Sequence, residues 1–541
     1  MTPAALVDPT SAPRPRPPDA GIAAPLDSLA GRKVALVQNA WPSWHRMTDR
    51  LGSLLADREH SAGTPQHLVP NGSAADPEQL RLIAAAADAA VVGLANCGSC
   101  TAWSHHDAVV LSSFGIPVVL VVTSEFTSLV DALAKSTGVR LPTVTIGTNP
   151  ETVDAATALR LLDDAYPAVV RALTTPPPPA DAERAWPASG ARSAAAADGE
   201  PPVLAERIRA DGDEADAVER CHELGWTDGL PVIPPTGHRV GAMLAVLGDP
   251  DDVVASMPPS GAPVTNRALA ANAVMAGCLP AHLPVLAAIV RAVCVPEFNL
   301  HGVATTTGPS TPFAVVSGPA AGDAGLNAGR GVLGPGWRAN ASIGRAVRLL
   351  IANVGGARPG EVSKSIMGQP GRYTMCIAEN EAESPWEPLR VTLGLDQSQS
   401  AVTVLGATGT MNVLTPRGDV DAMLAILADS LAYLGNPNVV MGKGTVGVLV
   451  TPGHAAAMAR AGLAKADVAA EIWTRSSIPL DRFPASGHPD PPYEFILRDG
   501  RVYPVAGPER VCVIVAGGPE PTHATVVPSH PSCNPVSVPV R

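Results

Sequence analysis

The sequence predicts an α/β fold in two modules, and three observations support this. Short apolar strands alternate with helical segments over residues 25–175, a stretch rich in proline and alanine follows over 176–202, and residues 203–541 show mixed helix and strand signals. Repeated strand–helix units with continuously apolar strands are typical of a parallel sheet covered by helices on both faces. We therefore predict a doubly wound, flavodoxin-like N-terminal domain, a linker, and a larger mixed α/β (α+β) C-terminal module.

The N-terminal domain is predicted from the spacing of its apolar runs and from helix-capping signals. Asp76 stands where a helix N-cap is expected, and Pro77 follows at the first helical position. Residues 1–24 are rich in proline and alanine, so we expect them to form a disordered tail. The predicted strands cover 33–38, 67–70, 89–94, 117–122 and 142–146, and the predicted helices cover 44–56, 77–88, 102–113, a segment ending at Lys135, and 153–173.

The C-terminal module is expected to form one large domain or two subdomains divided near residue 390. Its elements follow from the period of the apolar residues, which is about 3.6 in helices and 2 in strands. The predicted helices cover 203–224, 265–277, 281–293, 341–353, 418–434 and 453–469, and the predicted strands cover 302–306, 312–317, 391–396, 401–405, 445–451 and 511–516.

Composition and charge argue against several classes of function. The chain is 46% hydrophobic with a formal net charge of −12, and it has no basic stripe, so we expect no nucleic-acid partner. The longest apolar run, 116–122, is far shorter than the ~20 residues of a membrane helix, and residues 1–24 lack the apolar core of a signal peptide. We expect a cytoplasmic protein without membrane association, its eight cysteines reduced. A homo-oligomeric state is left open.

The strongest chemical signal is the turn Asn96-Cys-Gly-Ser-Cys100 between an apolar strand and a helix. Ligands of open parallel sheets bind beyond the carboxyl ends of strands, and the first amides of a helix carry partial positive charge. A thiol at such a point ionises more readily, and the thiolate is its reactive form. We expect Cys97, outside the helix, to be the nucleophile, and Cys100, in its first turn, to resolve or orient it. Gly98 is expected to let the chain turn tightly.

Further polar residues surround this turn. His105 and His106 follow in the same helix, where either one acts as a general acid or base for Cys97 or is simply a surface or capping residue. Asn96, Ser99 and Thr101 are expected to contact the substrate, and Ser99 or Thr101 to cap the helix. A zinc half-site is the alternative interpretation of the Cys-x-x-Cys pair. Zinc needs two more ligands, and the chain has no second such pair, so we predict no metal site.

The residues around the turn carry a family resemblance. The stretch Gly93-Leu-Ala-Asn-Cys-Gly-Ser-Cys-Thr-Ala-Trp-Ser-His-His-Asp-Ala108, followed by Phe114-Gly-Ile-Pro-Val-Val119, resembles the UGSC family, named for selenocysteine-Gly-Ser-Cys, over about residues 30–175. The resemblance implies that Cys97 occupies the position of the reactive chalcogen. Sulfur in place of selenium keeps nucleophilic and redox chemistry but raises the pKa.

Two weaker resemblances extend this interpretation. The turn is similar to that of the selenoprotein subunits of glycine and proline reductases, which implies reductive cleavage of a carbon–heteroatom bond. The segment from Trp226 to His523 resembles a conserved-hypothetical module that accompanies UGSC-type domains. The active site is then expected at the interface of the two modules.

Loops rich in glycine and proline hold two groups of candidates in the C-terminal module. The loop 226–236 carries Trp226 and Asp228, either as substrate-lining residues or in a structural Ω-loop. The Gly/Thr segment 299–312 carries His301, a candidate catalytic acid, and Thr306, whose neighbourhood could hold an anion.

Three further positions are candidates. Arg338 and Asn340 lie beside a helix start, where a carboxylate or phosphate docks unless the segment is an ordinary turn. Glu379, close to Glu381, is a candidate acid or base unless it faces solvent. His523 follows a buried strand and is another candidate base.

The leading hypothesis is a thiol-dependent oxidoreductase or lyase, in which Cys97 attacks a small-molecule substrate bound between the modules and a carbon–heteroatom bond is cleaved. The second is non-redox cysteine catalysis of the racemase or decarboxylase kind. The third is a binding module in which Cys97, Cys100 and a histidine hold zinc or copper. No flavin, nicotinamide or pyridoxal motif is evident, so we expect no cofactor, and an external thiol reductant is left open as a co-reactant.

Overall fold

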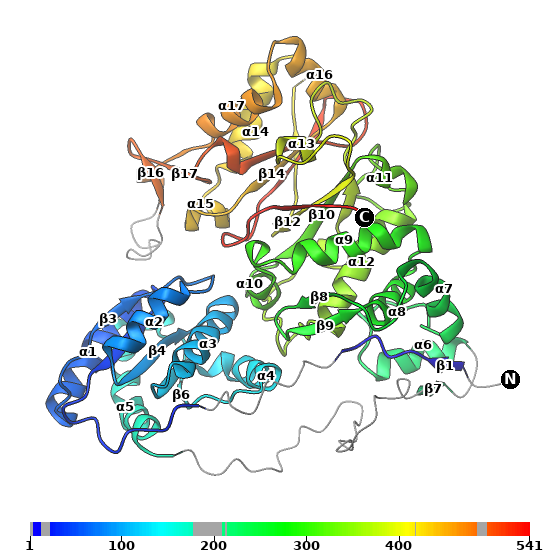
Figure 1. Cartoon of the computed structure of the whole chain (residues 1–541). Helices are drawn as coiled ribbons and strands as arrows, with labels where there is room; N and C mark the ends of the chain where they lie inside the picture. The colour runs from blue at the N-terminus through cyan, green and yellow to red at the C-terminus, as the bar shows by residue number, and fades with distance from the viewer. Residues whose placement is uncertain (1–3, 12–21, 177–207, 211–213, 417, 484–494) are drawn as a thin grey trace.

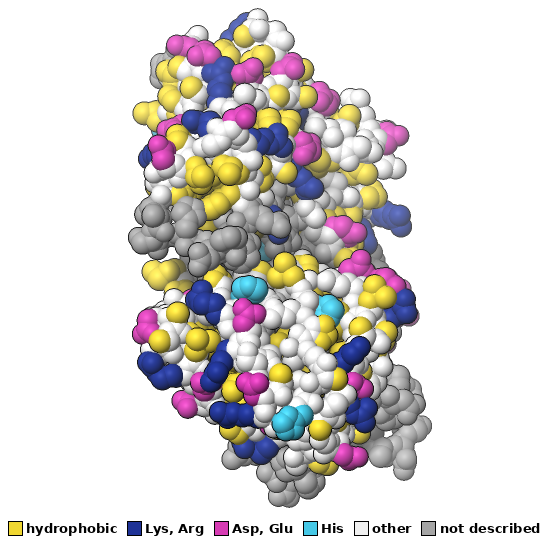
Figure 2. All heavy atoms as spheres, turned by 90° about the vertical axis from the view of Figure 1, so that its left-hand side faces the viewer, with side chains coloured by type: hydrophobic (Ala, Val, Ile, Leu, Met, Phe, Trp, Pro, Cys, Tyr) yellow, Lys and Arg dark blue, Asp and Glu magenta, His cyan; other side chains and the backbone are white. Residues whose placement is uncertain are grey.

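The structure is a computed structural model that describes residues 4–11, 22–176, 208–210, 214–416, 418–483 and 495–541. The linker expected at 176–202 therefore lies outside the described residues except for its first position. Figure 1 shows the N-terminal domain, in blue to cyan, beside a larger C-terminal module, in green to red. Figure 2 shows basic and acidic side chains intermixed over one face that includes both parts.

The N-terminal domain is built on a five-stranded parallel sheet with the order β3-β2-β4-β5-β6, which is the flavodoxin-like order and confirms the predicted fold class. The strands are short and apolar, and the three central ones are buried along their whole length, because helices cover both faces. They are β2 (Val34–Gln38), β3 (Gln66–Leu68), β4 (Ala89–Ala95), β5 (Val118–Thr123) and β6 (Thr143–Ile146).

Successive side chains of each strand point to opposite faces of the sheet and therefore contact different helices. Val34 and Leu36 of β2 belong to a buried cluster with α1 (Pro42–Glu59) and α5 (Ala155–Thr174). Ala35 and Val37 belong to the cluster on the opposite face, with α2 (Pro77–Ala86), α3 (Gly98–Ser113) and α4 (Thr127–Thr137). That second cluster continues without a break into the C-terminal module, so the two modules share one core.

The C-terminal module contains two four-stranded sheets packed face to face. Phe313 and Val315 of β10 share a buried cluster with Leu449 of β14, whereas Ala314 and Val316 face helices on the other side. The first sheet has the order β11-β10-β12-β20 and the second β13-β19-β14-β18. Their strands are β10 (Thr311–Ser317), β11 (Cys376–Ala378), β12 (Ala401–Ala407), β13 (Met411–Leu414), β14 (Val446–Val450), β18 (Val511–Val515), β19 (His523–Val527) and β20 (Val536–Pro539).

Helices cover the outer face of each sheet, so the module has four layers, helix–sheet–sheet–helix. The first sheet is covered mainly by α8 (Asn266–Ala276), α9 (Leu283–Val293) and α12 (Arg338–Asn353), and the second by α14 (Val420–Leu431), α16 (Pro452–Arg460) and α17 (Lys465–Arg475). Shorter elements complete it: α6 (Glu214–Glu223), α7 (Gly237–Leu247), α10 (Leu300–Thr305), α11 (Pro319–Asp323), α13 (Leu389–Thr392), α15 (Pro437–Met441), β8 (Val253–Met257), β9 (Ala262–Thr265), β15 (Ile478–Pro479), β16 (Ile496–Arg498) and β17 (Arg501–Tyr503).

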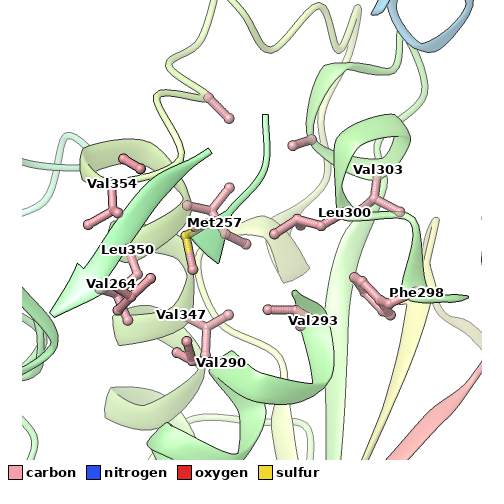
Figure 3. Close-up of a cluster of buried hydrophobic side chains, with 14 of the residues drawn as sticks. Met257, Val264, Val290, Val293, Phe298, Leu300, Val303, Val347, Leu350 and Val354 are labelled. Atoms are coloured by element: carbon pink, nitrogen blue, oxygen red, sulfur yellow. The ribbon is translucent and has the colours of Figure 1, made fainter. Parts of the chain in front are cut away.

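Figure 3 shows a part of this shared core. Val290 and Val347 lie below Met257, and Leu300 and Val303 of α10 belong to the same cluster. Because α10 packs directly on α3, this core supports the segment of the C-terminal module that meets the Cys-Gly-Ser-Cys turn.

Two observations bear on the predicted domain limits. Within the tail expected over 1–24, β1 (Ala4–Leu6) pairs antiparallel with β7 (Ile208–Ala210), and the Val7 amide donates to the Pro235 carbonyl. The apolar side chain of Leu6 is buried, which gives this segment a place on the C-terminal module. Strands from both sides of residue 390 pair within the first sheet, since β10 and β12 are neighbours.

Four predicted elements of the C-terminal module were wrong in type or extent. The expected strands 302–306 and 391–396 fall on the helices α10 and α13. In α10 the cap that the Asn299 side chain provides outweighs the β propensity of threonine and valine. The expected helix 453–469 is two helices, α16 and α17, broken at Gly462, whose φ is +87°. The expected helix 203–224 is helical only from 214 in the described residues.

Among the described helices, none is by itself long and apolar enough to cross a membrane. One pair, Asn266–Ala276 with Pro280–Val293, meets the length and composition limits together but is bent by 119°. Residues of both helices of this pair belong to the buried core of which Figure 3 draws a part.

Candidate functional site

Cys97 occupies the N-cap of α3, immediately after the carboxyl end of β4. Its backbone is extended, with φ −146° and ψ 172°, and its sulfur accepts a hydrogen bond from the Cys100 amide at 3.2 Å. In return, the Cys97 amide donates to the Cys100 sulfur at 2.7 Å. The two thiols thus form a reciprocal capping box, in which sulfur does what a serine and a glutamate usually do. Ser99 and Thr101, which we expected to cap the helix, do not.

This hydrogen bonding separates the two thiols chemically. Hydrogen bonding from the Cys100 side chain, together with the amides of the first turn, lowers the pKa of Cys97 despite its burial. Burial raises the pKa of Cys100 well above the usual value, and the adjacent Cys97 sulfur raises it further. Cys97 is therefore the thiol that ionises first, and Cys100 keeps its proton and donates to the Cys97 carbonyl at 3.2 Å.

Gly98 brings the two modules into contact beside the reactive sulfur. A Cβ at this position would lie 1.8 Å from the Thr305 carbonyl oxygen and 3.0 Å from the Thr306 carbonyl carbon. Gly98 is not among the residues with positive φ, so its role is close approach and not the tight turn we expected. A Cβ at Gly72 would likewise lie 2.5 Å from Ser532 Oγ. At these two glycines the backbone of the N-terminal domain therefore lies directly against the C-terminal module.

A second device holds this interface. Asn299, at φ +55°, donates to the carbonyls of Gly72 (2.8 Å) and Ser532 (2.9 Å) and accepts from Trp103 Nε1 (3.2 Å) and the Gly302 amide (3.0 Å). One side chain therefore joins both modules and caps α10, which fixes Thr305 and Thr306 against Gly98.

Cys97 lines a cavity of about 530 Å³ to which both modules contribute. This volume suits a small molecule. The N-terminal domain supplies Trp41, Asn71, Gly72, Cys97 and Ser99 to the described lining. The C-terminal module supplies Thr306, Thr307, Gly308, Pro309, Ser310, Thr408, Gly409, Thr410, Met411, Tyr433, Gly435, Pro437, Met441, Pro528, His530, Pro531 and Ser532. Of the residues predicted from sequence to form the site, the cavity wall includes Cys97, Ser99 and Thr306.

His530 is a member of this wall that our sequence analysis did not identify. It is 6% exposed, and its Nδ1 accepts a hydrogen bond from the Ser532 amide at 3.2 Å, so the proton of the neutral ring sits on Nε2. Burial lowers its pKa to about 4. His530 is thus a neutral imidazole in the cavity that holds Cys97, and its Nε2–H can donate a hydrogen bond. The candidate His523 lies instead at the exposed start of β19, against Asn412.

The predicted catalytic histidines lie together but in a different cavity. His105, His106 and His301 line a space of about 410 Å³ between α3, α4 and the β8–β9 hairpin. Burial lowers the pKa of His105 to about 4 and that of His301 to about 3. The Cys97 cavity includes none of the three in its described lining. A role for them in proton transfer with Cys97 stays a prediction.

Glu379 is enclosed by partners and lies outside the Cys97 cavity. Its carboxylate accepts from Ser317 Oγ at 2.7 Å and from the Leu389 amide, and Lys465 Nζ lies 3.3 Å away. The side chains of the pair are 1% and 2% exposed. This buried pair joins the first sheet to α17, so the solvent-facing alternative for Glu379 does not hold.

The loop with Trp226 and Asp228 packs on α12. Arg345 donates two hydrogen bonds of 2.8 Å to the Asp228 carboxylate and another to the Pro231 carbonyl. Asn353 donates to the Trp226 carbonyl. These contacts have the character of a structural loop.

The remaining predicted substrate-binding residues also have structural partners. Asn340 bonds the backbone of Asn327 and Val332, and Arg338 donates to the Gly277 carbonyl. Asn96 donates to Asn149 at 2.9 Å beside the turn, and Thr101 is fully buried behind it.

The fold and the site together define the class: a flavodoxin-like domain with two capping thiols at a strand end, closed by an αββα module. Residues 5–175 match the model of the UGSC family, so the chain carries a UGSC family domain in its N-terminal part, and the rest of the chain is unassigned. This confirms the resemblance and extends it to the first strand. No curated protein and no solved structure matches the chain.

Proposed function

We propose that the protein is a thiol-dependent enzyme in which Cys97 acts as a nucleophile on a small molecule bound between the two modules. The observation that carries this proposal is the position of Cys97: the N-cap of α3, with a lowered pKa, on the wall of a cavity that both modules form. A thiolate with access to a ligand-sized cavity is the form of cysteine that reacts.

The reaction we favour is reductive or lyase-type cleavage of a carbon–heteroatom bond. In the reductive form, the Cys97 thiolate attacks the heteroatom, an S–heteroatom bond forms, the carbon–heteroatom bond breaks, and the carbon takes a proton. The Cys100 thiol then attacks the Cys97 sulfur and releases the heteroatom group, and a disulfide forms. An external dithiol restores both thiols and is itself oxidised.

We propose that His530 donates a hydrogen bond to the substrate in this step. Its Nε2 carries the proton of a neutral ring on the cavity wall. With a pKa of about 4, the ring is not an acid at pH 7, so the proton that the carbon takes comes from water.

Non-redox cysteine catalysis is the second candidate, and one observation favours it. Cys100 is buried, its pKa is raised, and its sulfur is held by the Cys97 backbone on both sides. A thiol held in this way orients Cys97 without being consumed. For the third candidate, a zinc or copper module, no group of three or more His, Cys, Asp or Glu among the described residues has the geometry of a metal site.

Peptide-mapped alkylation with limiting iodoacetamide tests the proposal. We expect Cys97 to be the fastest of the eight cysteines at pH 7, and Cys100→Ala to slow it because the hydrogen bond that lowers its pKa is lost. Cys294→Ala is the matched control, since Cys294 is half-buried at the end of α9 and lines neither cavity. If Cys97 reacts no faster than Cys294, the proposal fails.

A thiol count with and without mild oxidant then separates the two reactions. Loss of two thiols, mapped to a Cys97–Cys100 disulfide that dithiothreitol reverses, supports the reductive cycle. Retention of both thiols under oxidant supports non-redox catalysis.

A further inference from the structure

The wall of the Cys97 cavity has an unusual chemical composition. None of its described residues is an aspartate, glutamate, lysine or arginine. Eight carry hydroxyl groups: Ser99, Thr306, Thr307, Ser310, Thr408, Thr410, Tyr433 and Ser532. The rest are glycines, prolines, the large apolar side chains of Trp41, Met411 and Met441, and the polar side chains of Asn71, Cys97 and His530.

Apart from Cys97, the titratable groups of this wall are neutral at pH 7. Burial lowers the pKa of His530 to about 4, so the imidazole is uncharged. Burial raises the pKa of Tyr433, so the phenol keeps its proton. Cys97 alone is shifted toward its charged form. When it ionises, its negative charge has no cationic side chain beside it on the described wall.

This arrangement discriminates against anions at the reacting position. A carboxylate or phosphate there would leave water without gaining an ion pair, and it would lie next to the thiolate. An uncharged group has neither cost. Hydroxyls and backbone amides supply hydrogen bonds that suit a carbonyl, hydroxyl or amide.

We propose that the Cys97 cavity selects a substrate whose reacting part is an uncharged, polar electrophile, bound through hydroxyl groups of the C-terminal module. This inference rests on the proposed function of Cys97. Tyr433 is the binding residue we name first: it is only partly buried on the cavity wall, and its phenol keeps its proton because burial raises its pKa. A phenol O–H on the wall can donate a hydrogen bond to a ligand that fills the cavity.

Charged parts of a substrate lie outside this cavity. An adjoining space of about 880 Å³ shares Asn71, Gly72 and Ser532 with it and has Lys443 and Arg510 on its wall. Neither cation lines the Cys97 cavity. The selection we propose therefore concerns the atoms next to the sulfur.

A pair of alkylating reagents tests the inference directly. Iodoacetamide and iodoacetate react in the same way: the thiolate displaces iodide, a carbon–sulfur bond forms, and iodide leaves with the electron pair. They differ only in an uncharged amide against a carboxylate. The rate of each at Cys97 is measured by peptide mapping at pH 7 and ~0.5 M salt, where a Debye length of about 4 Å screens the net charge of the protein. 2-Mercaptoethanol is the reference thiol.

We expect the ratio of the iodoacetamide rate to the iodoacetate rate to be at least tenfold larger at Cys97 than at 2-mercaptoethanol. Thr410 is exposed on the cavity wall, so Thr410→Lys is expected to bring the ratio down at least threefold relative to Thr410→Gln. A ratio at Cys97 within twofold of the reference overturns the inference while leaving Cys97 reactive. Slow reaction with both reagents, at rates no higher than at Cys294, overturns the proposed function itself.

Discussion

The contact between Gly98 and Thr305 predicts that Gly98→Ala lowers the stability of the protein, whereas helix propensity alone predicts an increase. Alanine at position 98 would place its Cβ 1.8 Å from the Thr305 carbonyl oxygen and 2.7 Å from the carbonyl carbon. Both atoms belong to the backbone, so the clash is relieved only if the two modules move apart by roughly 1 Å or if α3 shifts, and overpacking of this kind costs about 1–3 kcal/mol.

Without this clash the substitution would have the opposite effect. Position 98 is in the first turn of α3, and alanine is favoured over glycine in a helix by up to about 1 kcal/mol. Gly147→Ala is the control, because a Cβ there has no neighbour within 4 Å and Gly147 is not among the glycines with positive φ. We expect the control to stay within about 0.5 kcal/mol of the wild type.

Urea unfolding followed by tryptophan fluorescence measures the stability, and iodoacetamide labelling of Cys97 measures access to the cavity. For Gly98→Ala we expect a free energy of unfolding about 1–3 kcal/mol lower and faster labelling of Cys97. A Gly98→Ala protein that is as stable as the wild type, or more so, with an unchanged labelling rate, would refute the reasoning that the modules meet at this backbone contact.

Three other substitutions test separate features. Asn299→Ala is expected to lower the free energy of unfolding by about 2–4 kcal/mol, since it removes four hydrogen bonds and puts alanine at φ +55°. Asn299→Gly should lower it by less, because glycine tolerates that φ. Equal losses for the two variants would show that the φ is unimportant. Glu379→Gln should lower stability by about 3–5 kcal/mol, since it leaves Lys465 buried and unpaired, while the labelling rate of Cys97 stays as in the wild type; a slowed rate would instead favour a catalytic role. Burial lowers the pKa of His301 to about 3, so below pH 6.5 the unfolded chain binds a proton that the folded protein does not. As the pH is lowered, this group therefore reduces the free energy of unfolding by about 1.4 kcal/mol per pH unit. In urea titrations between pH 6.5 and 4, His301→Gln should make this decrease shallower, and an unchanged slope would contradict the lowered pKa of His301.

The N-terminal domain was predictable because its signals are local. Apolar strands such as Ala89–Ala95 and a cap such as Asp76 depend on neighbouring residues only, and the structure has both where the pattern indicated. The reactive turn was predictable for the same reason: a strand end followed by a helix start puts Cys97 at an N-cap in any parallel sheet.

The partners of Cys97 were not predictable, because they come from far along the chain. His530 and Thr410 reach the cavity only through the packing of two sheets, and nothing in their own segments indicates it. His105 is close to Cys97 in sequence, which suggested that the two side chains share one site. Eight residues along a helix correspond to about 12 Å, however, and His105 lines another cavity. The type of α10 was missed because the positive φ of Asn299, which caps that helix, has no sequence signature of its own.

The pairing of β1 with β7 has a consequence for how the chain is made. The two strands of this small sheet are about 200 residues apart, and the five-stranded parallel sheet of the N-terminal domain lies between them. At ~5–20 residues per second of synthesis, the first strand waits roughly 10–40 s for its partner to emerge from the ribosome. The five-stranded sheet of the N-terminal domain is therefore synthesised in full before β1 can pair with β7.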